Sequence, residues 1–156
     1  MKNALLFIGV LIFSCPLWSH SNNSPSDSSS SQSGKIVISI EGLDNPQGQA
    51  MIALHNTKKT FLKKTEPFRR AIVPISGDSL TYTFDEIPHG EYSVAVIQDD
   101  NKNMDLDLGK MFIPKEKFGF SNNPSSKYGP PGYKKTTFEL NTEVKEINIK
   151  LYKITL

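Results

Sequence analysis

The stretch Lys35-Ile-Val-Ile-Ser-Ile-Glu-Gly42 places isoleucine at every second position. Successive side chains of an extended strand point to opposite faces, so residues 36, 38 and 40 would share one face. The glycine that ends the stretch is a residue that commonly interrupts strands. This stretch therefore predicts a half-buried β-strand that ends at Gly42.

Six further segments carry similar patterns and are separated by residues typical of turns. They occupy residues 49–55, 71–75, 79–84, 91–97, 136–140 and 144–151. Pro74 lacks the backbone N–H that a central strand needs, which predicts an edge strand or a bulge in residues 71–75. Seven short strands without a long helical pattern indicate an all-β fold, and we expect an antiparallel, seven-stranded β-sandwich.

The first 21 residues have the pattern of a signal peptide, because Lys2 is followed by an apolar run over residues 4–13. A helix that spans a bilayer needs about 20 apolar residues, so this run is too short. Cleavage after Ser21 would release a soluble chain. Alternatively, Ile12-Phe-Ser-Cys15 resembles a lipoprotein box in which Cys15 carries the lipid. We expect an exported protein that is periplasmic, attached to the outer membrane or secreted.

Residues 22–34 are rich in serine and predict a disordered tether, because such a segment buries too little apolar surface to offset its ordering entropy. Residues 35–156 are then the folded domain. The formal net charge of +2 is too small to indicate nucleic-acid binding. A single cysteine excludes an internal disulfide and a multi-cysteine zinc site.

Two segments carry a resemblance to a known family. They are Ile87-Pro-His-Gly-Glu-Tyr-Ser-Val-Ala-Val-Ile-Gln-Asp-Asp-Asn-Lys-Asn103 and Ile113-Pro-Lys-Glu-Lys-Phe-Gly-Phe-Ser-Asn-Asn123. With Gly129-Pro-Pro131 they resemble the exported bacterial family called domain of unknown function 2141, over residues 35–152. The resemblance implies an envelope protein with a sandwich similar to transthyretin-like and carboxypeptidase regulatory-like modules, an Ig-like arrangement being the alternative. It implies no established reaction or ligand.

The segment that follows residue 98 resembles the start of a calcium-binding loop, because oxygen-bearing side chains recur at alternate positions. Met104 stands where such a loop needs glycine, Lys110 replaces its bidentate glutamate, and the family also usually has glycine where Lys102 and Met104 stand. We therefore expect a weak Ca²⁺ site, or alternatively an Asx-turn loop whose carboxylates cap backbone amides. The predicted metal ligands are Asp99, Asn101, Asn103, Asp105 and Asp107.

Residues 99–133 form a long stretch with little alternation, in which aromatic residues and prolines recur. Aromatic side chains on such a loop can stack on sugars or hold a peptide, so we expect an envelope glycan, peptide or protein as the partner. The alternative is that they cover one open end of the sandwich. The predicted ligand-binding residues are Phe118, Phe120, Ser121, Asn122, Asn123 and Tyr128.

Residues 58–70 form a basic segment with interleaved apolar side chains. Its cations are Lys58, Lys59, Lys63, Lys64, Arg69 and Arg70. Such a segment can bind an anionic membrane surface, where each cation contributes about 1 kcal/mol. The alternative is a solvated edge whose aromatic side chains point into the core. Nucleic acid is not expected, because the protein is exported and no recognition motif accompanies the charge.

No arrangement typical of an enzyme is present. The sequence has no nucleophile elbow, no His-x-x-x-His pair and no phosphate-binding loop. We therefore predict no catalytic residues. The leading hypothesis is a non-catalytic, exported envelope module that binds or scaffolds and is stabilised by calcium at residues 99–107. The alternative is a membrane-surface or lipid A-binding protein that acts through residues 58–70.

Overall fold

The computed structural model describes residues 32–63, 66–125 and 129–154. The predicted signal peptide, the alternative lipid-bearing Cys15, most of the tether and Tyr128 lie outside these residues. The elements are β1 (Ser33–Glu41), β2 (Gln49–His55), β3 (Arg69–Pro74), β4 (Ser79–Pro88), β5 (Gly90–Asp99), η1 (Lys110–Phe112), β6 (Phe118–Phe120), α1 (Tyr133–Thr136), β7 (Thr137–Leu140) and β8 (Val144–Lys150). In the described ranges, no helix is both long and apolar enough to span a membrane.

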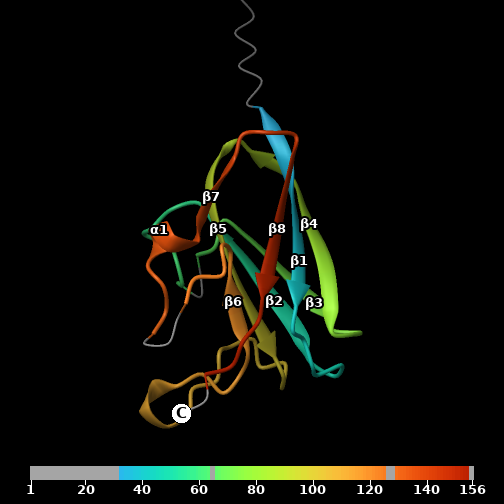
Figure 1. The fold of residues 1–156 in the computed structure, drawn as a ribbon, viewed down its shortest axis with the longest axis vertical. Helices are drawn as coiled ribbons and strands as arrows, with labels where there is room; N and C mark the ends of the chain where they lie inside the picture. The colour runs from blue at the N-terminus through green and yellow to red at the C-terminus, as the bar shows by residue number, and fades with distance from the viewer. Residues whose placement is uncertain (1–31, 64–65, 126–128, 155–156) are drawn as a thin grey trace, which may run out of the picture.

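The strands form two sheets, which confirms the all-β prediction (Figure 1). In the first sheet β1 lies between β4 and β8. The second sheet has the order β3-β2-β5-β6, and β7 pairs with the part of β5 that precedes the β6 pairing. β3 lies at the edge of this sheet, as Pro74 predicted. The connection from β5 to β6, with the η1 turn, lies at the lower left of Figure 1.

Two details of the predicted fold are wrong. First, the sheets are not purely antiparallel, because β8 runs parallel to β1 with Lys35 opposite Val144 and Glu41 opposite Lys150. Second, the described residues contain eight strands rather than seven. The additional strand is β6, which has three residues and is too short to carry a recognisable alternation. In addition, β1 begins at Ser33, within the segment predicted to be a tether.

The two sheets share one hydrophobic core. The predicted face of β1 is confirmed, because Ile36, Ile38 and Ile40 are fully buried. They belong to one cluster with residues of the other sheet, such as Ile52 of β2 and Val96 of β5. Burying each such side chain contributes about 1.5–3 kcal/mol, so this shared core holds the sheets together.

The opposite face of the second sheet, which points away from this core, is also apolar in its centre. Met51 and Ala53 of β2 lie opposite Ile97 and Ala95 of β5, and Ala95 in turn lies opposite Phe120 of β6. The outer faces of antiparallel sheets commonly carry polar side chains in water.

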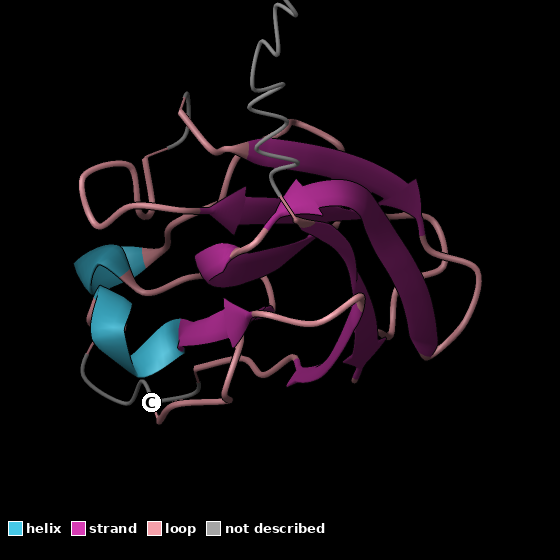
Figure 2. Cartoon of the chain, turned by 90° about the horizontal axis from the view of Figure 1, so that it is seen from above, coloured by secondary structure: helices cyan, strands magenta, loops and turns pink. Residues whose placement is uncertain are grey.

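Both short helical turns, η1 and α1, lie on one side of the molecule, at the left in Figures 1 and 2.

Candidate functional site

An open pocket of about 650 Å³, here called the outer groove, lies on this outer face of the second sheet. Ala53 and Ala95 lie directly opposite each other on neighbouring strands in the centre of its floor. Their side chains are single methyl groups, so the centre of the floor stays hollow where larger side chains would fill it. The floor consists of Met51, Ala53, Ala95, Ile97, Phe118 and Phe120.

The wall of the outer groove comes mainly from the connection between β5 and β6. Its apolar members are Met104, Leu106, Leu108, Met111, Phe112, Ile113 and Pro114. Met111 and Phe112 are 80% and 85% exposed, which is unusual for two adjacent large apolar residues. Contiguous exposed apolar surface on a soluble protein commonly marks an interaction site.

Three of these wall residues have a left-handed backbone. Met104, Met111 and Phe112 have φ values of 63°, 58° and 59°, and Lys102 has 60°. This conformation costs a residue other than glycine about 1–2 kcal/mol. Lys102 and Met104 therefore adopt a conformation that glycine would adopt most easily. Strain of this kind persists where the surroundings enforce it, and it concentrates at functional sites.

Asp99, the first predicted metal ligand, is completely buried and holds the start of the loop in place. Its carboxylate accepts hydrogen bonds from the backbone N–H groups of Asn103 (3.1 Å) and Met104 (2.9 Å). It also accepts a hydrogen bond from the Gln49 side chain at 2.7 Å. The two backbone bonds fix the chain as it enters the left-handed residue Met104.

The other predicted metal ligands are hydrogen-bonded to one another. The side-chain amides of Asn101 and Asn103 donate to the Asp107 carboxylate at 2.8 and 3.0 Å. Their own oxygens accept from the backbone N–H groups of Asn103 and Asp105, as in Asx turns. Asp105 accepts from the N–H of Leu106. Hydrogen bonds within the loop, some of them of the Asx-turn type, thus connect all five predicted ligands.

Glu116, which sequence reasoning missed, closes this loop from the other side. It is buried, and its two carboxylate oxygens accept from the backbone N–H groups of Asp100 (2.9 Å) and Asp107 (3.0 Å). Burial raises the pKa of the Glu116 carboxyl, while the two N–H groups act in the opposite direction. Within the described residues, no three His, Cys, Asp or Glu side chains gather as a metal centre. The calcium site stays a prediction.

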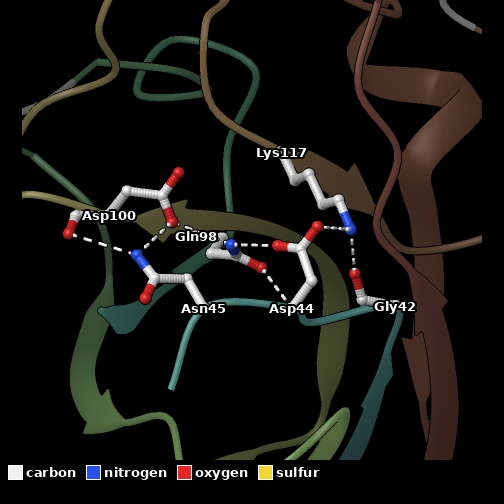
Figure 3. Close-up of polar contacts among 6 residues, drawn as sticks. All are labelled: Gly42, Asp44, Asn45, Gln98, Asp100 and Lys117. Carbon is white, nitrogen blue, oxygen red and sulfur yellow. Dashed lines mark hydrogen bonds and ion pairs between the residues drawn. The ribbon is translucent and has the colours of Figure 1, made fainter. Parts of the chain in front are cut away.

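A polar network fastens the base of the loop to the connection between β1 and β2 (Figure 3). The Gln98 amide donates to Asp44 at 2.7 Å and to Asp100 at 2.8 Å. The Lys117 ammonium group pairs with Asp44 at 2.7 Å and donates to the carbonyl of Gly42 at 2.8 Å. The hydrogen bond from Lys117, followed by that from Gln98, lowers the pKa of Asp44. The network therefore holds the loop beside the sheet that forms the groove floor.

The predicted ligand-binding residues divide into two groups. Phe118 and Phe120 are buried and contribute to the groove floor. The other described members connect strands: the Ser121 hydroxyl donates to the carbonyl of Thr136. The Asn122 amide donates to the carbonyl of Thr137, and that of Asn123 to the carbonyl of Asn148. In the described structure these polar side chains serve as strand connectors.

The comparisons with known proteins agree with the sequence resemblance. Residues 38–148 match a family described as uncharacterized protein conserved in bacteria, DUF2141. The chain belongs to this family. The match runs from β1 to β8 and includes nearly all of the outer groove. No curated protein and no solved structure matches the chain.

The basic segment of this DUF2141 protein has two partly buried aromatic side chains, Phe61 and Phe68. The ring of Phe61 packs against His55 at 5.7 Å and Tyr133 at 5.4 Å, whereas Leu62 is 42% exposed. Membrane binding by this segment stays a prediction. The described cations of the segment are exposed to solvent. Two of them, Lys63 and Arg70, line the outer groove.

His55 is the last residue of β2, shortly before the basic segment of residues 58–70, and it also lines the outer groove. The side chain is 1% exposed, and its Nδ1 atom has no hydrogen-bond partner among the described residues. Burial lowers the pKa of the imidazole below its usual 6.5, and the Arg70 charge lowers it further. A hydrogen bond with the Thr60 backbone acts in the opposite direction. Sequence reasoning missed the place of this residue in the groove.

Proposed function

We propose that this DUF2141 protein is a non-catalytic, exported module of the bacterial envelope that binds its partner in the outer groove. In this proposal the two sheets form a β-sandwich of transthyretin-like or Ig-like type. Export is supported by the apolar run at residues 4–13 behind Lys2. The sandwich is supported by the core that the two sheets share.

The observation that carries the proposal is the groove of about 650 Å³ with its apolar floor and exposed apolar wall. Sites for small molecules commonly have volumes of about 300–1,000 Å³, an apolar lining and a few polar groups. The floor lies on hydrogen-bonded strands, and the loop that supplies the wall is held by Asp99 and Glu116. A preformed site of this kind loses little conformational entropy on binding.

A neutral, environment-sensitive dye such as Nile red tests this proposal on the purified protein. We expect its fluorescence to rise with the wild type and to stay low with Ala95→Phe, because phenylalanine fills the centre of the floor. Thr81→Phe is the matched control, since it adds the same ring to an exposed position of β4 in the other sheet. Equal dye binding by the wild type and Ala95→Phe would contradict the proposal.

A second candidate function is binding to an anionic membrane surface through the basic segment. The exposed cations Lys58, Lys59 and Arg69 favour it, because they add to the charge of the two cations at the groove. Binding of this kind falls steeply with added salt, since exposed charges are screened. Co-sedimentation with vesicles that contain phosphatidylglycerol measures it, and binding that ignores salt would count against it.

A further inference from the structure

We infer that the outer groove binds a single aliphatic chain with an anionic headgroup, the chain over Ala53 and Ala95 and the headgroup at Lys63 and Arg70. This inference rests on the proposed function, because it names the ligand class of the same groove. It follows from the chemistry of the floor, from the distribution of charge around the groove and from the side chains of the wall.

The floor favours a chain without polar groups. β2 is hydrogen-bonded to β3 on one side and to β5 on the other, so its backbone N–H and C=O groups are already used. The side chains of the floor are all apolar. An amide or hydroxyl that loses water without gaining a partner costs about 1–3 kcal/mol in proteins. A peptide or a sugar would meet this cost repeatedly on the floor, whereas an aliphatic chain would not.

The charged groups of the groove are separated along its length. Arg70 lies opposite Ala53 on β3, but its charge acts on His55 at the end of β2, and Lys63 belongs to the segment that follows His55. Asp105 lines the other end, in the loop that leaves β5 beside Gln49. An anionic headgroup is therefore attracted to the first end and repelled from the second, which gives the chain one orientation.

The present partner of Lys63 is weak enough to be exchanged. Its ammonium group lies 3.7 Å from the Glu66 carboxylate, and both side chains are about half exposed. Exposed pairs of this kind contribute about 0–1 kcal/mol. A headgroup carboxylate or phosphate would replace this weak pair of Lys63 with a charge-assisted contact, beside the positive charge of Arg70.

The length and flexibility of the groove fit an aliphatic chain of moderate length. From residue 51 to residue 55, β2 extends about 13 Å along the groove, at about 3.3 Å per strand residue. This length corresponds to about ten C–C bonds of an extended chain. Met104 and Met111 in the wall are exposed, and unbranched methionine side chains adapt readily to an irregular apolar surface. They can therefore cover a chain that lies on the floor.

Fluorescence titration with dansylaminoundecanoic acid, followed by competition with dodecanoic acid or dodecanol, tests the inference on the purified protein. We expect wild type to bind the probe and Ala95→Phe to lose it. Dodecanoic acid should displace the probe at a concentration about tenfold below that of dodecanol, which corresponds to about 1.4 kcal/mol. The double variant Lys63→Ala/Arg70→Ala should bind the probe about tenfold more weakly and still bind Nile red.

The matched control is Lys58→Ala/Lys59→Ala, which removes the same charge from the same segment outside the groove. It should bind the probe like wild type. Equal competition by dodecanol and dodecanoic acid, or equal weakening by the two double variants, would overturn the headgroup assignment. If the wild type binds Nile red and Ala95→Phe does not, but the wild type does not bind dansylaminoundecanoic acid, the aliphatic ligand is overturned and the proposed function stands. If the wild type binds neither compound, the proposed function itself is overturned.

Discussion

The loop of residues 99–107 and the floor of the outer groove differ in whether their side chains already have partners within the protein. In the loop, the Asp99 carboxylate already accepts three hydrogen bonds. On the floor, Ala53 and Ala95 face an open volume of about 650 Å³. Polar groups with good partners gain little from a ligand. Covering apolar surface contributes about 25 cal/mol of favourable free energy per Å². The floor of the outer groove is therefore a better binding site than the loop.

The largest expected effect is a loss of stability when the hydrogen bonds of the loop are removed. Asp99→Ala leaves the N–H groups of Asn103 and Met104 without their acceptor and should lower the free energy of unfolding by about 3 kcal/mol. Asp85→Ala, at an exposed position of β4, should change it by less than about 0.5 kcal/mol. Urea denaturation measures both. Equal midpoints would show that the Asp99 network does not stabilise the protein.

The next effect contrasts the two faces of the second sheet. Ala50→Leu adds three carbon atoms to the closed core between the sheets and should destabilise the protein by about 1–3 kcal/mol. Ala95→Leu makes the same change above the groove floor, where there is room, and should be neutral or stabilising by up to about 1 kcal/mol. Thermal melting of the two variants checks this. A similar loss from both would mean that the outer groove is closed in solution.

Acid should weaken the fold through His55. The folded pKa of this buried imidazole is lowered, so its contribution to stability is complete above the usual pKa of 6.5 and is lost as the pH falls through the folded value. We therefore expect the free energy of unfolding to decrease below about pH 6.5 and His55→Gln to remove this part of the decrease. Parallel pH profiles for wild type and variant would contradict this.

The strained backbone of the loop predicts a smaller effect of opposite sign. Lys102→Gly should raise the free energy of unfolding by about 0.5–1 kcal/mol, because relief of the left-handed conformation exceeds the entropy cost of glycine. Lys115→Gly, in the same connection but without a positive φ, should lower it by about 0.5–1 kcal/mol. Urea midpoints that move in the same direction would contradict this account of the strain.

The smallest expected effect is that of calcium. If residues 99–107 form a weak site with a Kd near 1 mM, then about 1 mM CaCl₂ would stabilise the protein by about 0.4 kcal/mol. The melting temperature would then rise by about 1–3 °C in wild type. Asp107→Asn would lose that rise, because it removes a predicted ligand charge while preserving the side-chain shape. An unchanged melt in wild type would exclude the calcium hypothesis and leave the hydrogen-bonded loop.

Much of the fold was predictable from local patterns, because a buried face repeats every second residue, as in Ile36, Ile38 and Ile40. The parallel pairing of β1 with β8 was not predictable, since alternation does not encode the direction of a neighbouring strand. β6 was missed because it has only three residues and its central residue is Gly119, a residue that is uncommon in strands. The fold needs glycine there, because a Cβ atom would approach Ile149 to 2.8 Å.

The site was less predictable than the fold. Phe118 and Phe120 were identified because aromatic residues in a long irregular stretch are conspicuous, but Ala53 and Ala95 look like ordinary strand residues. Their hollow exists only because the register of β2 and β5 places one alanine opposite the other. Glu116 lies between two lysines, a pattern that predicts an exposed side chain. It is buried because the fold brings two backbone N–H groups to its carboxylate.

The most direct test of the central claim is a methyl NMR titration with dodecanoic acid. The folded domain contains four alanines, Ala50, Ala53, Ala71 and Ala95, so the methyl spectrum reports on both faces of the second sheet. The account predicts that Ala53 and Ala95 shift with the fatty acid while Ala50 and Ala71, buried in the core, stay close to their original positions. Saturable shifts confined to Ala50 and Ala71, or no shift at any of the four, would contradict it.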